Sequence, residues 1–302
     1  LRAINLKGSQ MLATGLLIFA TAIWGSTFIV VQDGINEMPM MMFMAWRFLF
    51  ATLAMVILRP KSLRMSRETF TQGVLIGLAL AFGYWTQTYG LLFTSATISG
   101  FITGMFVVLT PVAAMLIYKS RIGFNGWIAV GLATVGLALI SLKGWSFGVG
   151  ELWTLVGAGF FSFQIMWLSR WATPKSSSSI AFMQIATTGV VFWVGGLMFD
   201  GFALPPSIGS WKSILFLAVF ASAIAFIIQS WAQSHMTPTR AAVVLSFEPV
   251  FAGIFGVLVA GDQLTLRVVL GGLAILAAMF LIEFGDRNRE AVTDLAAPHQ
   301  GV

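Results

Sequence analysis

The sequence contains no cysteine and only two histidines, His235 and His299, in 302 residues. Without cysteine there is no disulfide bond, no thiolate metal site and no cysteine nucleophile. The two histidines lack the spacing of metal ligands, and there is no phosphate-binding P-loop. We therefore expect no metal, no cofactor and no enzymatic activity. A membrane enzyme, the alternative class, would need a nucleophile beside a base, and no histidine or second deep carboxylate is available for that role.

Charged residues are also scarce, at 9% of the chain, whereas 58% of the residues are hydrophobic. A soluble protein of this length would carry far more charge on its surface. About 20 apolar residues in a helix cross the roughly 30 Å hydrocarbon layer of a bilayer. Ten stretches of about this length fill the chain: 11–31, 39–58, 70–89, 96–118, 124–142, 151–171, 180–199, 213–233, 239–259 and 266–284. The sequence predicts an all-α polytopic membrane protein with ten transmembrane helices.

The positive charges are distributed unevenly between the gaps that separate these stretches. Of 17 lysines and arginines, Lys143, Lys212 and Arg267 lie in odd-numbered gaps and Arg47 lies inside a span. The other thirteen lie at the two termini and in even-numbered gaps. Because lysine and arginine accumulate on the cytoplasmic side, both termini of this multi-pass protein are expected there. The net charge of +6 is then a feature of topology and needs no nucleic-acid partner.

The two halves of the chain resemble each other. Residues 110–114 (TPVAA) in the fourth span parallel 248–252 (EPVFA) in the ninth, and 131–133 (GLA) in the fifth recurs at 272–274 in the tenth. A half with five spans is odd-numbered, so the second copy enters the membrane from the opposite side. We expect a 5+5 inverted-topology repeat, which places a transporter's substrate site near the midplane. The expected parts are a first five-helix repeat over 1–145, a second over 146–285 and a flexible cytoplasmic tail over 286–302.

Two charges lie deep within predicted spans, where ionisable groups are costly and often functional. Arg47 and Glu248 both fall near the midplane, about 12–13 Å from the nearest span end at 1.5 Å per residue. Either they form a structural ion pair, or Arg47 is a structural charge and Glu248 holds a substrate ammonium group or a proton. Pro249 follows Glu248 and frees backbone carbonyls nearby.

Prolines occupy related positions in the two halves. Pro111 lies in the fourth span and Pro249 in the ninth. Bends at matching positions of two repeats indicate hinges beside a transport path. Proline is also frequent in membrane helices without such a role.

Aromatic and amide side chains share helical faces deep in several spans. Rings supply contact area and amides fix orientation, which suits a neutral or zwitterionic organic solute. The same side chains can instead serve helix packing. The candidate substrate-binding residues are Trp24, Tyr84, Gln87, Thr88, Phe163, Gln164, Trp167, Gln229 and Glu248.

These features together resemble the EamA-type proteins of the drug/metabolite transporter superfamily. The resemblance rests on ten spans in two halves and on Trp24-Gly25, Arg47, Thr110-Pro111 and Glu248-Pro249-Val250 in their order. The family often has Gly-Glu after the ninth span, where this chain has Gly261-Asp262. The richness in aromatics is similar to that of YddG-type exporters of aromatic amino acids in bacterial inner membranes, and this resemblance implies the same location. The resemblance implies a basket-like bundle in which spans 1, 3, 4, 6, 8 and 9 surround a cavity and spans 5 and 10 lie outside.

We expect a secondary transporter that exports small metabolites, most of all amino acids including aromatic ones, by alternating access at that cavity. The partners are a small-molecule substrate and the lipid bilayer, with no ATPase subunit. A carrier of drugs, nucleotide-sugars or other metabolites is the alternative within the superfamily, and a channel or scaffold is an alternative outside it. Transport can be facilitative or proton-coupled, and one deep carboxylate gives proton coupling little support.

Overall fold

The computed structural model describes residues 2–119, 123–143, 146–235, 241 and 244–296. Their elements, in chain order, are α1 (Arg2–Glu37), α2 (Met40–Leu58), the 3-10 helix η1 (Pro60–Leu63), α3 (Arg67–Leu91), α4 (Ala96–Gly104), α5 (Phe106–Tyr118), α6 (Phe124–Ser141), β1 (Leu142–Lys143), β2 (Ser146–Phe147), α7 (Val149–Trp171), α8 (Ser177–Gly195), the π-helical turn η2 (Gly196–Asp200), α9 (Ile208–Phe216), the π-helical segment η3 (Leu217–Ile224), α10 (Ala225–Gln233), α12 (Glu248–Leu258) and α13 (Leu266–Ala296). The two short strands pair antiparallel.

The helices account for all ten predicted stretches. Six described segments are long and apolar enough to cross a membrane: Met11–Glu37, Met40–Leu58, Ala96–Tyr118, Val149–Trp171, Ser177–Asp200 and Ile208–Gln233. Three shorter apolar helices follow Phe124–Ile140, Glu248–Leu258 and Leu266–Leu281, and α3 is 25 residues long. Large apolar side chains such as Leu53 and Ile57 lie exposed on the outside of the bundle, where lipid would cover them. The chain is a multi-pass α-helical membrane protein.

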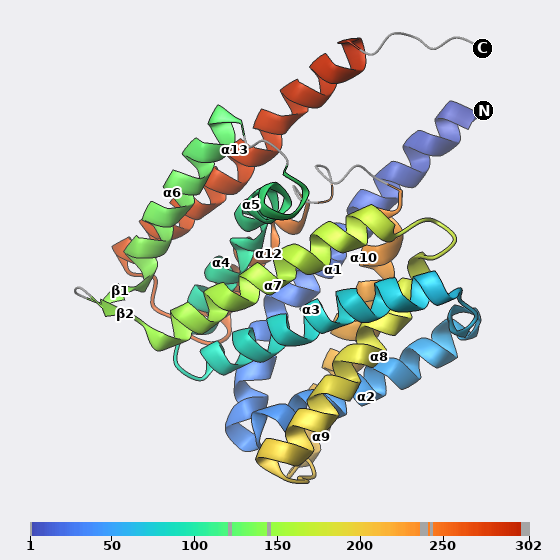
Figure 1. Ribbon diagram of the computed structural model, residues 1–302. Coiled ribbons are helices and arrows are strands. Elements are labelled where there is room, and N and C mark those ends of the chain that lie inside the picture. The colour runs from blue at the N-terminus through green and yellow to red at the C-terminus, as the bar shows by residue number, and fades with distance from the viewer. Residues whose placement is uncertain (1, 120–122, 144–145, 236–240, 242–243, 297–302) are drawn as a thin grey trace.

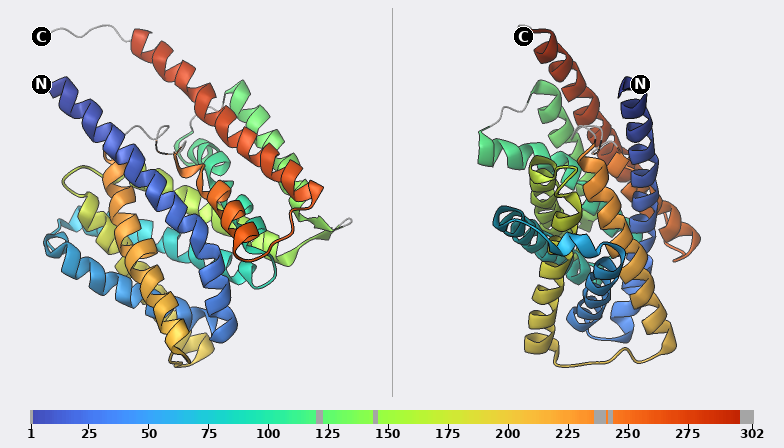
Figure 2. Two further views of the ribbon diagram at one scale, coloured as in Figure 1. Left: turned by 180° about the vertical axis from the view of Figure 1, so that it is seen from behind. Right: turned by 90° about the vertical axis from the view of Figure 1, so that its right-hand side faces the viewer.

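The arrangement places both ends of the chain together. The start of α1 and the end of α13 lie at the same end of the molecule (Figure 1), as an even number of spans requires. The pair α6 and α13 stands side by side at one edge, and the same pair is visible from behind (Figure 2). These are the fifth and tenth spans, which the resemblance placed outside the central bundle.

Two glycines let α12 lie directly against its neighbours. A methyl group on Gly25 of α1 would lie 2.5 Å from the Phe251 Cβ atom. A methyl group on Gly104 of α4 would lie 2.8 Å from the Pro249 ring. No side chain larger than hydrogen fits at either place, so these glycines permit the close helix approach that positions Glu248.

Several spans are not continuous α-helices. The fourth span consists of α4 and α5, which are separated at Met105. In the ninth span a turn at Ser246–Phe247 precedes α12. The eighth span changes to π-helical geometry over Leu217–Ile224, a feature that is frequent at functional sites.

Two predicted boundaries can be compared with the structure. The hairpin formed by β1 and β2 lies at the predicted junction of the two repeats, between residues 145 and 146. The last helix α13 runs on to Ala296, so residues 286–296, expected in a flexible tail, are helical. Arg240 and residues 297–302 lie outside the described residues.

Candidate functional site

A central cavity lies where spans 1, 3, 4, 6, 8 and 9 meet. It contains about 480 Å³ of empty space, including its open mouth, of which about 50 Å³ can hold the centre of a water-sized molecule. The spans around it are those that the resemblance implied. Its walls are formed by Trp24, Thr27, Phe28, Leu80, Tyr84, Gln87, Thr103, Phe106, Phe161, Gln164, Ile165, Phe226, Gln229, Leu245 and Glu248.

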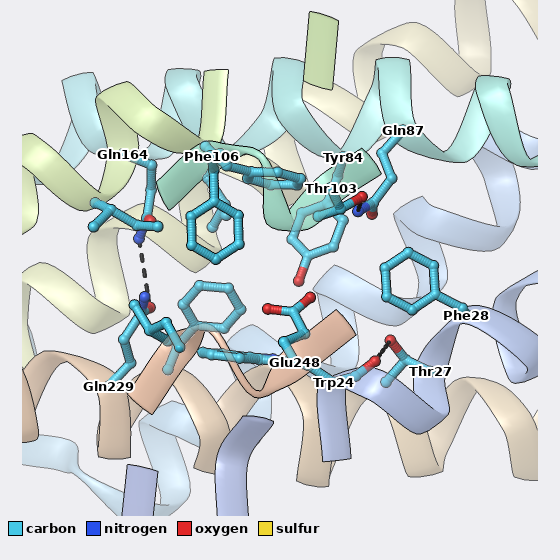
Figure 3. Close-up of a pocket in the computed structure, with 15 residues that line it drawn as sticks. Trp24, Thr27, Phe28, Tyr84, Gln87, Thr103, Phe106, Gln164, Gln229 and Glu248 are labelled. Atoms are coloured by element: carbon cyan, nitrogen blue, oxygen red, sulfur yellow. Dashed lines mark hydrogen bonds between the residues drawn. The ribbon is translucent and has the colours of Figure 1, made fainter. Parts of the chain in front are cut away.

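The Glu248 carboxylate occupies the middle of this cavity (Figure 3). Glu248 is the first residue of α12 and is followed by Pro249. The positive end of the helix dipole favours a carboxylate at this position. The Tyr84 hydroxyl points towards the carboxylate (Figure 3). Within the described residues, Glu248 makes no hydrogen bond or ion pair, so its oxygens are available to a ligand.

Amide side chains mark the two ends of the cavity. On one side, Gln87 donates from Nε2 to the Thr103 hydroxyl over 2.8 Å. On the other side, Gln164 Nε2 lies 3.5 Å from Gln229 Oε1 (Figure 3). Gln164 Nε2 also donates to Gln184 Oε1 over 2.9 Å. These bonds fix the amides before any ligand arrives, and fixed polar groups are what orient a bound solute.

Aromatic rings form the walls between these amides. The rings of Trp24 and Phe226 have centroids 5.2 Å apart, and Tyr84 meets Phe161 edge-on at 5.3 Å. Trp24 is also held by a hydrogen bond of 2.8 Å from Nε1 to the Ala221 carbonyl oxygen. Ala221 belongs to the π-helical segment η3. The wall is therefore rigid and apolar.

Arg47 does not line the cavity, although it touches the wall. Its side chain is 1% exposed, and its Nε donates to the Ser222 hydroxyl over 3.0 Å. Its guanidinium carbon lies 4.9 Å from the Tyr84 ring centroid and 5.1 Å from that of Phe48. The ion pair with Glu248 that the sequence allowed is not formed among the described side chains. The contacts are those of a structural charge.

Six of the nine predicted substrate-binding residues line the cavity, and three do not. Thr88 is buried in α3 away from the cavity. Phe163 and Trp167 line a different groove, which is apolar and lies between α3 and α7 with Phe82 and Leu75. They do not face the central cavity because the helical stripe chosen in the sixth span is rotated by about one residue from the stripe that faces it. Successive helical residues differ by 100° in direction.

The cavity-facing stripe of α7 contains Phe161, Gln164 and Ile165. Sequence reasoning missed Phe161 and Ile165, because an apolar residue in a membrane helix has the same composition signal whether it faces lipid or a cavity. Gln184 was missed as well. It is fully buried, and its Nε2 donates to the Ser230 hydroxyl over 3.3 Å. A glutamine deep in the seventh span is the signal that could have indicated it.

The two prolines lie close to the helix breaks but not at them. Pro249 is the second residue of α12, just after the turn at Ser246–Phe247. Pro111 lies within α5, six residues after the break at Met105. Their role as hinges stays a prediction.

Comparison with known proteins gives consistent results. The model of the EamA-like transporter family matches twice, at residues 11–142 and 148–284. An "Uncharacterized transporter" of Archaeoglobus fulgidus is 33% identical over 273 residues, covering 88% of this chain and 84% of the relative. The transporter YoaV of Bacillus subtilis is 24% identical over 91% of this chain and 97% of its own. The inner membrane transporter YedA of Escherichia coli is 24% identical over 90% of each.

The fold is also similar to that of a solved protein. A crystal structure superposes with a TM-score of 0.64 at 16% identity, covering 92% of this chain and 98% of the other. At this identity the likeness concerns the fold alone.

Proposed function

The chain belongs to the EamA-like transporter family, and we propose that it is a secondary exporter of small metabolites, most of all amino acids including aromatic ones. The observation that carries this proposal is the cavity with an unpaired carboxylate, fixed amides and aromatic walls. Such a set suits a small solute with a polar head and an apolar body. The carboxylate of Glu248 would meet the amino group, and rings such as Phe161 and Trp24 would pack against the side chain of the solute.

The proposed mechanism is alternating access. The two matched segments, 11–142 and 148–284, would rock about the cavity as two halves of an inverted repeat. The double match of one family model supports the repeat. The discontinuities at Met105 and at Ser246–Phe247 support movement in the fourth and ninth spans, because helix breaks beside a cavity are where transporter helices bend. The common end of α1 and α13 (Figure 1) supports placing both termini on the same side of the membrane, and the distribution of lysine and arginine favours the cytoplasmic side of a bacterial inner membrane.

The cavity chemistry bears on the alternative substrates. The described lining contains no lysine or arginine, whereas an anionic nucleotide-sugar would need several. Drugs with aromatic rings remain the second candidate, since rings such as Phe106 and Phe226 supply apolar area.

The test is counterflow in liposomes that contain only this protein. Vesicles preloaded with unlabelled phenylalanine should accumulate labelled phenylalanine or alanine without ATP. Leu80→Phe, which fills the cavity wall, should slow this flux, whereas Leu53→Phe on the exposed outer surface should not. The proposal would be refuted if protein-free vesicles accumulated label at the same rate. It would also be refuted if vesicles with folded protein showed no flux of any of several amino acids.

A further inference from the structure

The cavity presents hydrogen-bond acceptors, while several donors of its lining are engaged within the protein. Trp24 Nε1 donates to the Ala221 carbonyl, and the Thr27 hydroxyl donates to the Trp24 carbonyl over 2.7 Å. Gln87 Nε2 donates to Thr103. The two hydrogens of Gln164 Nε2 are directed to Gln184 and Gln229. These donor hydrogens are therefore not available to a ligand.

Several acceptor oxygens of the lining are available to a ligand. Neither oxygen of Glu248 has a hydrogen-bond partner among the described residues, and the same holds for Oε1 of Gln87 and of Gln164. The remaining donors are the Gln229 amide, the second hydrogen of Gln87 Nε2 and the hydroxyl groups of Thr103 and Tyr84, and the last of these points towards Glu248 (Figure 3). A primary ammonium group has three donors and no acceptor. Such a group complements the oxygens of Glu248, Gln87 and Gln164.

The charge of the lining leads to the same conclusion. Glu248 is the only charged residue of the described lining, which holds no lysine, arginine or histidine. An unpaired carboxylate in a low-dielectric site is costly, and a bound cation removes that cost. A carboxylate on the ligand would meet no cation in the lining. Arg47, the nearest buried one, lies outside the lining and is engaged by Ser222 and by the ring of Tyr84.

The walls also suit a cationic head on an apolar body. The faces of aromatic rings attract cations, and Trp24, Tyr84 and Phe226 all line the cavity beside Glu248. The apolar residues of the lining, such as Leu80 and Phe106, would pack against the body of the ligand.

We infer that the cavity selects its ligand by a protonated amino group held by Glu248, that the ligand class is primary amines with an apolar or aromatic body, and that a carboxylate on the ligand is not required. Amino acids are one case of this class, so the inference rests on the proposed function and narrows it. Amines without a carboxylate are then ligands as well.

Three ligands with one phenylethyl body test the inference on the wild-type protein. Phenethylamine carries only the ammonium group, phenylalanine carries both charges and 3-phenylpropionate carries only the carboxylate. Binding to purified protein at neutral pH is measured by calorimetry. Phenethylamine should bind at least as tightly as phenylalanine, and 3-phenylpropionate about ten-fold or more weakly. Equal or tighter binding of 3-phenylpropionate would overturn the inference.

Two variants test whether Glu248 is responsible for the preference for an amino group. Glu248→Gln should weaken phenethylamine by about ten-fold or more and bring the three affinities within a few-fold of each other. Glu151→Gln is the matched control, because Glu151 is also buried but lies outside the cavity, and it should keep the wild-type order. A folded Glu248→Gln that retains the preference for phenethylamine would overturn the assignment. Amine binding without counterflow would refute the exporter proposal alone, whereas counterflow with equal acceptance of 3-phenylpropionate would refute this inference alone.

Discussion

At the scale of single residues, the two deep charges differ in how their surroundings satisfy them. Arg47 is enclosed by a hydroxyl and two aromatic faces, although its Nη2 has no hydrogen-bond partner. Glu248 has an open cavity in front of it. A buried cation held in this way depends on each contact it has, whereas the carboxylate depends on a ligand. The role of Arg47 is therefore tested by measuring stability, and the role of Glu248 by measuring ligand binding.

Removing the hydroxyl that Arg47 uses should destabilise the fold. Ser222→Ala leaves Nε as well as Nη2 without a partner, which costs about 1–3 kcal/mol. Adding Arg47→Met should recover much of this loss, because it removes the unpaired cation. Thermal unfolding in detergent measures both. Ser26→Ala is the control, since Ser26 donates within its own helix, and a double variant no more stable than Ser222→Ala would contradict the argument.

Aromatic residues on the two faces of α7 should differ in their effect on transport. Phe161 lies in the cavity wall against Tyr84, and Trp167 lies in the outer groove. Aromatic pairing contributes about 0.5–1.5 kcal/mol beyond buried area. Phe161→Ala should lower phenylalanine uptake relative to alanine uptake by about two- to ten-fold, and Trp167→Ala should leave that ratio unchanged. The measurement is liposome uptake of both substrates, and the opposite pattern would restore Trp167 to the site.

Helix α7 shows how far the sequence alone can predict which residues face the cavity. Gln164, chosen from the sequence as a substrate-binding residue, lines the cavity, because a polar residue in a membrane helix is usually buried inside the bundle. Its neighbours Phe163 and Trp167 line the outer groove instead, since hydrophobic periodicity cannot define a stripe where lipid and protein are equally apolar. The rotation of a membrane helix is fixed by its neighbours, and these are known only from the fold.

At the scale of elements, the sequence located the discontinuous spans but not their breaks. Pro111 and Pro249 identified spans 4 and 9, yet the breaks lie at Met105 and at Ser246–Phe247. The π-helical segment η3, Leu217–Ile224, contains neither glycine nor proline. No local sequence feature predicts this segment, because its role is a tertiary contact: the Ala221 carbonyl oxygen accepts a hydrogen bond from Trp24 Nε1.

Carboxylates of the second half cap helices of the first. Asp200 Oδ2 accepts from the backbone N–H groups of Met41 and Met42, at 2.8 and 3.2 Å, at the start of α2. Asp262 Oδ2 accepts from the Thr97 N–H over 2.9 Å at the start of α4. Both lie in gaps expected outside. They therefore join the two halves at one end of the bundle.

Removing these caps should loosen that end. Asp200→Ala with Asp262→Ala costs about 0.5–2 kcal/mol per cap, and the cavity should open more often towards this side. A Thr27→Cys reporter in the cysteine-free chain measures the opening by its rate of reaction with a polar thiol reagent. The rate should rise in the double variant and stay unchanged with Asp33→Asn, an exposed acidic residue. An unchanged rate in the double variant would mean that the caps serve stability alone.

At the scale of the whole molecule, the sequence predicted the ten helices well because span length and apolar composition are dictated by the bilayer itself. The outer position of α6 and α13 came from the resemblance and is seen in the structure (Figure 2). The extension of α13 to Ala296 was missed, since a polar tail can be helical or not according to its own propensities.

Orientation is the property on which alternating access and the inverted repeat both depend. Arg64 lies in an exposed connection between α2 and α3, and Leu204 lies exposed between η2 and α9. If lysine and arginine mark the inside, position 64 is cytoplasmic and position 204 is external. Single cysteines at these places, in intact cells, should react with a membrane-impermeant reagent at 204 and not at 64. Permeabilised cells should label both, which controls for reactivity. Labelling at 64 in intact cells would reverse the topology, and Asp200 and Asp262 would then close the cytoplasmic side of the cavity and not the external one.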